Sequence, residues 1–153
     1  MYAFYSAFQA LIVIAELKEG ESALIHAGAS GVGIAAAQLA HLVKAYVPSH
    51  PNGLFSLLNS KTIISTSTTA SKLEFLKTIP NGPTDTIDTK AHPTFETEVK
   101  RITDGKGVNV VIDFVAATFW ASNIESLALD GRMTMLAVLG GLPSSSSFLL
   151  CRD

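Results

Sequence analysis

The sequence predicts an α/β fold, with a doubly wound parallel sheet between two layers of helices. Short apolar runs alternate with stretches of helical periodicity, an arrangement typical of parallel sheets. The first apolar run ends in a glycine cluster, and an alanine-rich segment follows it. The 153 residues are 48% hydrophobic and 16% charged, which excludes a disordered chain and suffices for one domain with a buried core.

Five segments have the composition of buried strands, because they are short, apolar or rich in β-branched residues. They are Ala23–Ala27, Thr62–Thr66, Thr86–Asp88, Val108–Val115 and Arg132–Leu139. Val108–Val115 is the strongest of them and Thr86–Asp88 the weakest. Right-handed crossovers between parallel strands leave few topologies, and the doubly wound one is the commonest.

Helices are expected before the first strand and between the strands. They cover Met1–Ala15, Ile34–Ala45, Ser71–Ile79, Phe95–Ile102 and Phe119–Leu129. In the second helix, Ala35, Leu39 and Leu42 recur at helical spacing and should share one side. The opening run is apolar, and we interpret it as a buried helix. It lacks a basic start and is shorter than the ~20 residues that span a bilayer, so we predict neither a signal peptide nor a membrane span, and a cytoplasmic location.

Composition also limits the partners and the site chemistry. The net charge of −2 indicates neither nucleic acid nor an anionic membrane as a partner. The single cysteine, Cys151, cannot form an internal disulfide, and no Cys/His group has metal-ligand spacing, so we predict no metal site. His26 lies in the first expected strand, and we interpret it as a hydrogen-bonded core residue rather than a base.

The loop between the first strand and the alanine-rich helix carries the chemistry. Its six residues are Gly28, Ala29, Ser30, Gly31, Val32 and Gly33. Gly28 permits a tight turn, Ser30 and Gly31 keep the backbone close to a pyrophosphate, and Gly33 lets the helix approach the sheet. Free N–H groups and the positive end of the helix dipole then face the phosphates. The alternative is a glycine-rich turn that binds no ligand.

The end of the second strand indicates which dinucleotide would bind. Residues 65–72 contain hydroxyl side chains and Lys72 but no Asp or Glu. An acidic residue there would bind the 2′-hydroxyl of NAD, whereas hydroxyls and a cation suit the 2′-phosphate of NADPH. We therefore predict NADPH as the cofactor. Thr69 or Ser71 could instead cap the following helix, and both roles can hold together. The missing acid also counts against a methyltransferase that uses S-adenosylmethionine.

Several segments, in the same order, resemble a known family. They are Ser6–Gln9, Gly20-Glu21, Leu24–Gly33, Ala35-Ala36, Gln38–Ala40, Gly105–Phe114, Phe119-Trp120, Asn123, Leu127–Arg132 and Leu139–Gly141. With these segments the chain resembles the zinc-free quinone oxidoreductases of the medium-chain dehydrogenase/reductase superfamily, in the p53-inducible quinone oxidoreductase-like branch. The resemblance implies a Rossmann-type NAD(P)-binding domain over residues 1–153. It also implies hydride transfer from NADPH to a quinone or another activated carbonyl, with a homodimer as one assembly.

The resemblance also assigns roles to individual residues. Ser30 to Gly33 would hold the pyrophosphate, and Thr69 and Lys72 the adenosine ribose phosphate. Asp113 to Val115, together with Leu139, Gly140 and Gly141, would line the ribose and the nicotinamide. Ser6 stands where the family has a threonine near the nicotinamide, and Thr89 where it has a tyrosine near the adenine. For Asp113 the alternative is a carboxylate that only caps backbone groups at the end of its strand. No catalytic acid or base is assigned.

Two departures from the family pattern concern the extent of the chain. Family members carry a GroES-like domain before this one, so we expect residues 1–153 to be the nucleotide domain of a longer enzyme, with little turnover alone and an uncovered apolar side on Tyr2–Leu17. A non-catalytic dinucleotide-binding or interaction module is the alternative. Residues 46–60 form an insert, read either as a lid or partner loop or, preferably, as an unspliced intron, since the flanks join cleanly without it. Residues 143–153 are expected to form a flexible tail that begins a further strand at a truncated edge.

Overall fold

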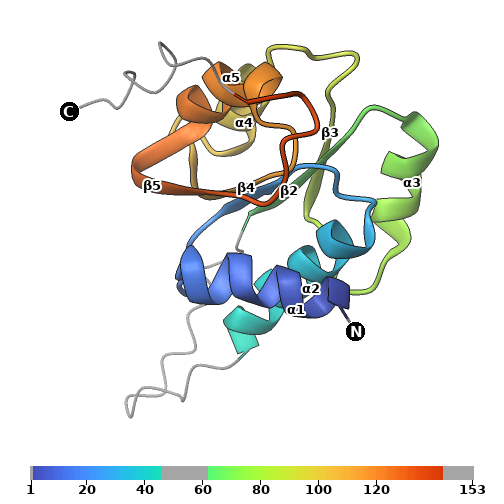
Figure 1. The fold of residues 1–153 in the computed structure, drawn as a ribbon, viewed down its shortest axis with the longest axis vertical. Helices are drawn as coiled ribbons and strands as arrows, with labels where there is room; N and C mark the ends of the chain where they lie inside the picture. The colour runs from blue at the N-terminus through green and yellow to red at the C-terminus, as the bar shows by residue number, and fades with distance from the viewer. Residues whose placement is uncertain (1, 46–61, 143–153) are drawn as a thin grey trace.

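A computed structural model describes residues 2–45 and 62–142, and the insert at 46–60 and the tail at 143–153 lie outside the described residues. Five parallel strands form one sheet in the order β3-β2-β1-β4-β5 (Figure 1). They are β1 (Ala23–Ile25), β2 (Ile63–Ser67), β3 (Asp85–Asp88), β4 (Val108–Asp113) and β5 (Leu127–Met135). This order confirms the doubly wound prediction, because the chain runs from β1 outward to β3 and then crosses back to β4.

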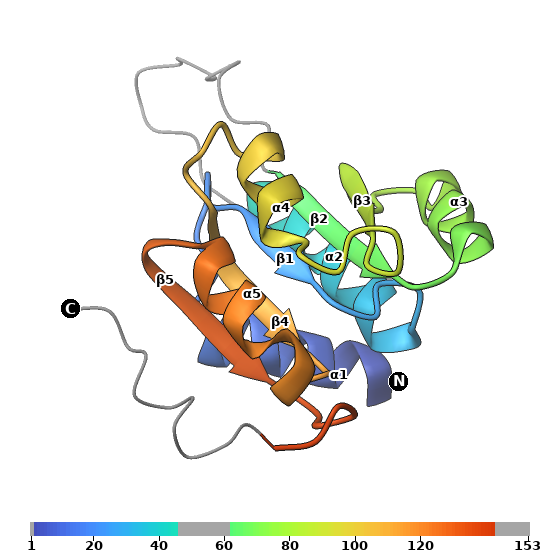
Figure 2. The ribbon, with the colours of Figure 1, turned by 90° about the horizontal axis from the view of Figure 1, so that it is seen from above.

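Helices cover both faces of the sheet, as Figure 2 shows. They are α1 (Tyr2–Phe8), α2 (Gly31–Ala45), α3 (Ala70–Thr78), α4 (Glu96–Ile102) and α5 (Trp120–Ser126), with a π-helical turn η1 (Gln9–Ile14) and a 3-10 turn η2 (Ala117–Phe119). Side chains of a strand alternate between the two faces. Accordingly Ile25 packs into a core with α1, η1 and α2, whereas Leu24 packs into a second core with residues of α4, such as Val99.

The N-terminal helix differs from the buried helix that the sequence predicts. It buries only a narrow stripe of mostly small residues, among them Ala7, Ala10 and Leu11. The larger side chains point away, and Tyr2 and Tyr5 are 91% and 67% exposed. The helix also widens in η1, where the Ala15 N–H donates to the Ala10 carbonyl at 3.0 Å, five residues back along the chain. The apolar composition of this run therefore reflects an exposed surface as much as a core.

The last helix and the last strand differ most from their predicted bounds. The predicted helix Phe119–Leu129 ends at Ser126, and β5 begins at Leu127 rather than Arg132. The cause is a register shift that lets Leu127 pair with Val108 across a bulge. This pairing brings the chain within 2.7–2.8 Å of where a Cβ on Gly107 would lie, so it requires a glycine there. In α2, Ala35 and Leu39 are buried as predicted, whereas Leu42 is exposed, and most of the side against the core is alanine because α1 packs there.

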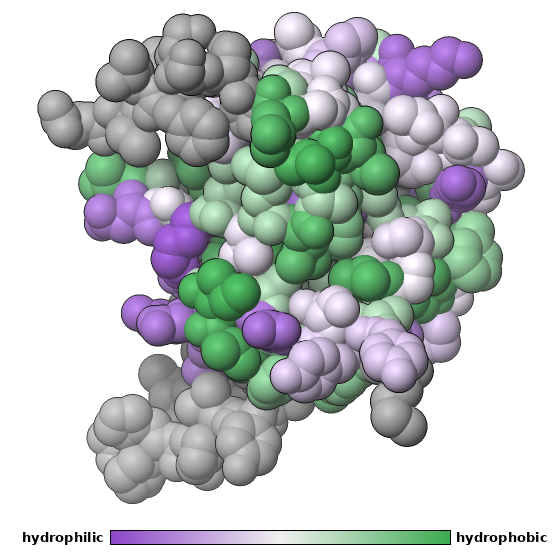
Figure 3. Space-filling model, in the orientation of Figure 1, coloured by the Kyte–Doolittle hydropathy of each residue, from purple (hydrophilic) through white to green (hydrophobic). Residues whose placement is uncertain are grey.

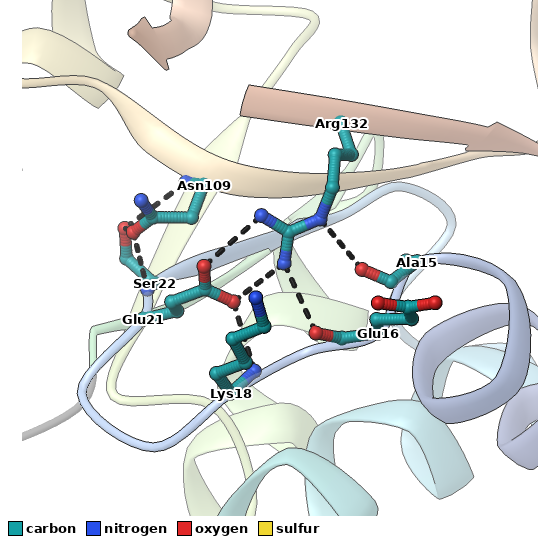
Figure 4. Close-up of polar contacts among 7 residues, drawn as sticks. All are labelled: Ala15, Glu16, Lys18, Glu21, Ser22, Asn109 and Arg132. Carbon is teal, nitrogen blue, oxygen red and sulfur yellow. Dashed lines mark hydrogen bonds and ion pairs between the residues drawn. The ribbon is translucent and has the colours of Figure 1, made fainter. Parts of the chain in front are cut away.

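A partly buried arginine fork fastens the N-terminal segment to β5 (Figure 4). The guanidinium of Arg132 donates to both carboxylate oxygens of Glu21, at 3.0 and 2.6 Å, from Nη1 and Nη2. Its Nε–H donates to the Ala15 carbonyl at 2.6 Å, and Nη2 also donates to the Glu16 carbonyl at 3.2 Å. Two carbonyls at the end of η1 thus receive a charged donor where the helix leaves them without an intrahelical partner.

Apolar side chains gather on the face that carries α1 and the end of β5, which Figure 3 shows as green areas. The exposed large apolar residues of these segments include Phe4 in α1, Val13 and Ile14 in η1, and Leu139 and Leu142 after β5. An uncovered apolar side was predicted for the N-terminal helix, and the exposures confirm it. No helix among residues 2–45 and 62–142 is long and apolar enough to cross a membrane.

Candidate nucleotide site

The candidate site lies where the strand order reverses, at the carboxyl ends of β1 and β4. In an open parallel sheet, this is the position where a ligand finds a crevice between loops that diverge to opposite faces. Three loops meet there: residues 27–30 after β1, residues 114–116 after β4, and residues 136–141 after β5. The sequence had placed the glycine loop and the residues around Asp113 and Gly140 at one site, and the topology brings these loops to the same edge of the sheet.

The glycine loop makes a tight turn into α2. Ala27 adopts a φ of +47°, the Gly28 N–H donates to the Thr66 carbonyl at 2.9 Å, and the Ser30 N–H donates to the Ala27 carbonyl at 2.8 Å. The hydroxyl of Ser30 accepts a hydrogen bond from the Gly33 N–H at 3.0 Å. Ser30 is therefore the N-cap of α2. The sequence analysis did not predict this role, although serine is among the preferred residues directly before a helix.

Two of the three glycines in this loop are required by close packing, and the third is not. A Cβ at Gly33 would lie 2.6 Å from the Ala27 carbonyl oxygen, and one at Gly28 would lie 2.6 Å from the Cβ of Ser65. Both positions exclude a side chain because helix and strand approach so closely. A Cβ at Gly31 would meet only the Cβ of Ala3, at 3.5 Å. This is an ordinary van der Waals contact, so no close approach within the described residues requires a glycine at position 31.

Two backbone N–H groups at the start of α2 remain available. Ser30 satisfies the N–H of Gly33 and also, through its carbonyl, that of Ile34 at 2.9 Å. Within the described part of the chain, no hydrogen bond engages the N–H of Gly31 or Val32. They lie at the positive end of a 15-residue helix, where an anion is favoured. The loop therefore offers a pyrophosphate two hydrogen-bond donors and the positive end of a helix dipole.

The loops after β4 and β5 are joined by main-chain hydrogen bonds. The N–H groups of Leu139 and Gly140 donate to the carbonyls of Phe114 and Val115, at 3.1 and 2.6 Å. The N–H of Ala117 donates back to the Gly141 carbonyl at 3.1 Å. We call these joined segments, residues 114–117 and 139–141, the two-loop wall. A Cβ at Gly140 would lie 2.7 Å from the Val115 carbonyl, so the contact requires a glycine.

Asp113 supports this wall from inside the protein. Its side chain is fully buried, and its carboxylate accepts hydrogen bonds from the N–H groups of Val115, at 2.8 Å, and Ala116, at 3.2 and 3.1 Å. Of the two roles that the sequence left open for Asp113, the geometry shows the capping of backbone groups. Direct contact with a cofactor stays a prediction for this residue.

Thr69 and Lys72 lie at the start of α3, beside the end of β2. Thr69 occupies the N-cap position, but its hydroxyl makes no capping hydrogen bond, and both side chains are exposed. No carboxylate lies in residues 65–72, yet Asp88 pairs in register with Ser67 on the neighbouring strand. The Asp88 carboxylate accepts the N–H groups of Lys90 and Ala91, at 2.8 and 3.3 Å. This neighbour could be found only from the strand order.

His26 is a buried, hydrogen-bonded core residue, as predicted. Its Nδ1 lies 2.9 Å from the Thr66 hydroxyl, and its Nε2 lies 2.6 Å from Oδ1 of Asn123. Neutral imidazole satisfies both contacts when Nε2–H donates to Asn123 and Nδ1 accepts from Thr66. Burial lowers the pKa of His26, and the hydrogen bond with Asn123 and the charge of Asp113 offset only part of this effect. The rings of Phe95 and Phe119 lie 5.0 and 4.9 Å away.

Other features complete the description of the site. Ser6 is half-buried on α1, the helix whose Ala3 approaches the glycine loop. Two grooves in the described residues lie elsewhere: one of about 260 Å³ beside α3 and β3, and one of about 520 Å³ at the amino ends of the strands. No group of three or more His, Cys, Asp or Glu side chains in the described residues could hold a metal ion.

This fold and loop geometry define an NAD(P)-binding domain of the Rossmann type. Residues 56–152 match the family described as zinc-binding dehydrogenase, which is more than half of the chain. The protein therefore belongs to this family, within the medium-chain dehydrogenase/reductase superfamily, whose domains typically bind NAD(P)H.

Relatives and solved structures agree with this assignment. The chain is 36% identical over 130 residues to a highly reducing polyketide synthase of Aspergillus niger, covering 85% of this chain but 4% of the relative. It is similar to a mycobacterial quinone oxidoreductase, with 26% identity and a TM-score of 0.74 over 93% of this chain and 38% of that one. A mycobacterial protein complexed with NADPH gives the same identity and TM-score over 94% and 38%. The enoyl reductase CurK matches with 26% identity and a TM-score of 0.72 over 95% and 38%.

Proposed function

We propose that this chain is the NADPH-binding domain of an oxidoreductase that transfers a hydride to a quinone or another activated, electron-poor acceptor. The glycine loop carries the proposal. Its N–H groups at Gly31 and Val32 have no partner in the described residues, and no close approach there requires Gly31 to be a glycine. A loop that served only to turn the chain would need Gly28 and Gly33 but not Gly31.

NADPH fits the residues that surround this loop. The pyrophosphate would lie against the N–H groups of Gly31 and Val32, and the adenosine ribose phosphate near the exposed Thr69 and Lys72. Bound NADPH supplies a hydride from its nicotinamide, while the protein orients the ring and excludes water. The two-loop wall, with Leu139, Gly140 and Gly141, would border the nicotinamide ribose. The similarity to a mycobacterial protein complexed with NADPH supports the choice of cofactor.

The acceptor class has two candidates. The resemblance to quinone oxidoreductases favours a quinone, and a similar structure is described as a quinone oxidoreductase. The relationship to polyketide synthases and the similarity to the enoyl reductase CurK favour an α,β-unsaturated thioester. Both acceptors are electron-poor conjugated carbonyl compounds, so the same hydride donor serves either. The chain spans 4–7% of the curated relatives, and the acceptor pocket of a whole enzyme can include residues beyond it.

Calorimetric titration with NADPH and NADH tests the proposal directly. We expect NADPH to bind, and to bind more tightly than NADH. The variant Gly31→Val should abolish binding, because its side chain would crowd the N–H groups that face the phosphates, and its unfolding temperature measures what the added contact with Ala3 does to the fold. Gly33→Val is the matched control, since a side chain there clashes with the Ala27 carbonyl and should lower stability as well. Unchanged NADPH affinity in folded Gly31→Val would show that the loop is only structural.

Turnover separates the oxidoreductase from a non-catalytic binding module. NADPH oxidation is followed by its near-ultraviolet absorbance with a simple quinone and, separately, with a short enoyl thioester. Activity with one acceptor and not the other assigns the class. Binding of NADPH with no turnover in a polypeptide that includes the flanking sequence of the natural protein would favour the module.

A further inference from the structure

The backbone of Ala116 is strained, and it lies in the two-loop wall. Ala116 has a φ of 69° and a ψ of −114°, a conformation that side chains with a Cβ rarely adopt. It is one of two alanines with positive φ at this edge of the sheet, the other being Ala27 in the glycine loop. Such conformations persist only where the surrounding structure holds them.

The carboxylate of Asp113 supplies the holding force. Both of its oxygens accept from the Ala116 N–H, at 3.2 and 3.1 Å, and one also accepts from the Val115 N–H at 2.8 Å. A buried carboxylate requires such donors, because ion pairs within the described residues do not include Asp113. The strained residue and the buried charge therefore stabilise one another.

The conformation of Ala116 fixes the positions of its neighbours in the wall. The preceding carbonyl, of Val115, accepts the Gly140 N–H, and the following N–H, of Ala117, donates to the Gly141 carbonyl. A change in φ or ψ at Ala116 would rotate one of these groups out of its hydrogen bond. The position of the segment 139–141 therefore follows that of Ala116.

We propose that Asp113 is a positioning residue that holds the two-loop wall in shape for NADPH by clamping Ala116, and that it does not contact the cofactor itself. This inference rests on the proposed function, in which the wall borders the nicotinamide ribose. The full burial of Asp113 and the use of both oxygens by backbone N–H groups support it. Asp113 acts through the backbone of its neighbour, so its importance should depend on which residue occupies position 116.

A double-mutant cycle separates the clamp from direct contact. Asp113→Asn preserves the shape of the side chain but removes its negative charge and replaces one of the two oxygens that accept from the Ala116 N–H with an NH2 group, which cannot accept. Ala116→Gly removes the strain, because glycine adopts positive φ without steric cost. In the unmodified background, Asp113→Asn should weaken NADPH affinity by about tenfold or more. In the Ala116→Gly background, the same substitution should weaken it less than about threefold.

Equal losses of affinity in the two backgrounds would overturn the clamp and point to direct contact. The absence of any loss in both backgrounds would also overturn the clamp. Asp88→Asn is the matched control: Asp88 also ends a strand and accepts two backbone N–H groups, but residues 89–92 contain no positive φ. Its effect should be the same in both backgrounds. If Asp113→Asn fails to fold, rescue of folding by Ala116→Gly supports the clamp, and failure of that rescue overturns it.

The same cycle read as urea unfolding keeps this inference apart from the proposed function. If the unmodified chain binds no NADPH, the proposed function fails, yet the unfolding midpoints still report whether Asp113 and Ala116 are coupled. Coupled midpoints support the clamp, and additive ones overturn it.

Discussion

Replacing Arg132 with methionine should destabilise the domain by about 2 kcal/mol. The substitution removes four hydrogen bonds, two to Glu21 and two to the Ala15 and Glu16 carbonyls. Breaking a fully buried pair costs about 3–5 kcal/mol, whereas exposed pairs contribute about 0–1 kcal/mol. Here the side chains of Arg132 and Glu21 are 33% and 17% exposed, so the loss should lie between these limits. Methionine keeps the apolar stem, so the loss reports the polar fork.

Urea unfolding followed by circular dichroism measures this loss. Arg101→Met provides a matched control, because Arg101 pairs with Glu98 on the surface of α4, where the arginine side chain is 69% exposed. We expect that control to cost less than about 0.5 kcal/mol. Arg132→Lys should fall between the two, since an ammonium cannot bridge both carboxylate oxygens and both carbonyls. If Arg132→Met is as stable as the control, the fork does not fasten the N-terminal segment and the reasoning is wrong.

The pH dependence gives an independent check on the same group. Burial raises the pKa of Glu21, but the hydrogen bonds and charge of Arg132 outweigh this, together with the Lys18 N–H and charge, so the pKa is lowered from its ordinary value of 4.5. A lowered pKa in the folded state stabilises the protein above the unfolded pKa, and this stabilisation is lost as the pH falls through the folded pKa. The difference in unfolding free energy between the unmodified chain and Glu21→Gln should therefore shrink below about pH 4.5.

Three further predictions concern other parts of the site. Lys72→Glu should remove the preference for NADPH over NADH by weakening NADPH affinity about tenfold, which calorimetry measures. If the variant keeps the preference, Lys72 does not bind the 2′-phosphate. Burial lowers the pKa of His26, so the free energy of unfolding should fall as the pH drops below the ordinary value of 6.5. His26→Gln should make this pH dependence less steep. An equally steep pH dependence in the variant would show that another group causes it. The polypeptide of residues 1–153 should bind NADPH but reduce quinones slowly. Hydride transfer needs a closed, dry site, and neither of the two grooves described above encloses the glycine loop. Rapid NADPH oxidation in the absorbance assay would show that the domain is active by itself.

The architecture follows from signals that act locally along the chain. Alternating apolar runs and helical periods predict the five strands, and the glycine cluster after Ala23–Ala27 predicts the strand order, because it marks the first strand of a doubly wound sheet. The predicted start of β5, at Arg132 rather than Leu127, was wrong. Pairing across a bulge decided it, and no local pattern in Leu127–Gly131 reveals that Val108 lies opposite.

Some features of the candidate site could also be predicted from the local sequence, whereas others could not. Gly28 and Gly33 are glycines for reasons that the motif states, the close approach of helix and strand. The capping role of Ser30 was also readable from its place before the helix. In contrast, the main-chain bonds between Val115 and Gly140, and the positive φ of Ala116, depend on how two loops far apart in sequence meet. Alanine carries no local preference for that conformation, so only the folded chain reveals it.

The loops after β4 and β5 are joined in a way that lets side chains near the site change without breaking the join. The bonds that join the two segments run from one peptide group to another, and none of these uses a side chain of Phe114, Val138 or Leu139. These three side chains are half-buried or exposed at the rim of the site. Phe114 also packs against the core beside α1 and α2, but Val138 and Leu139 are exposed. The size and polarity of Val138 and Leu139 can therefore vary while the peptide framework stays in place, so a new acceptor can be accommodated by substitutions at these two positions.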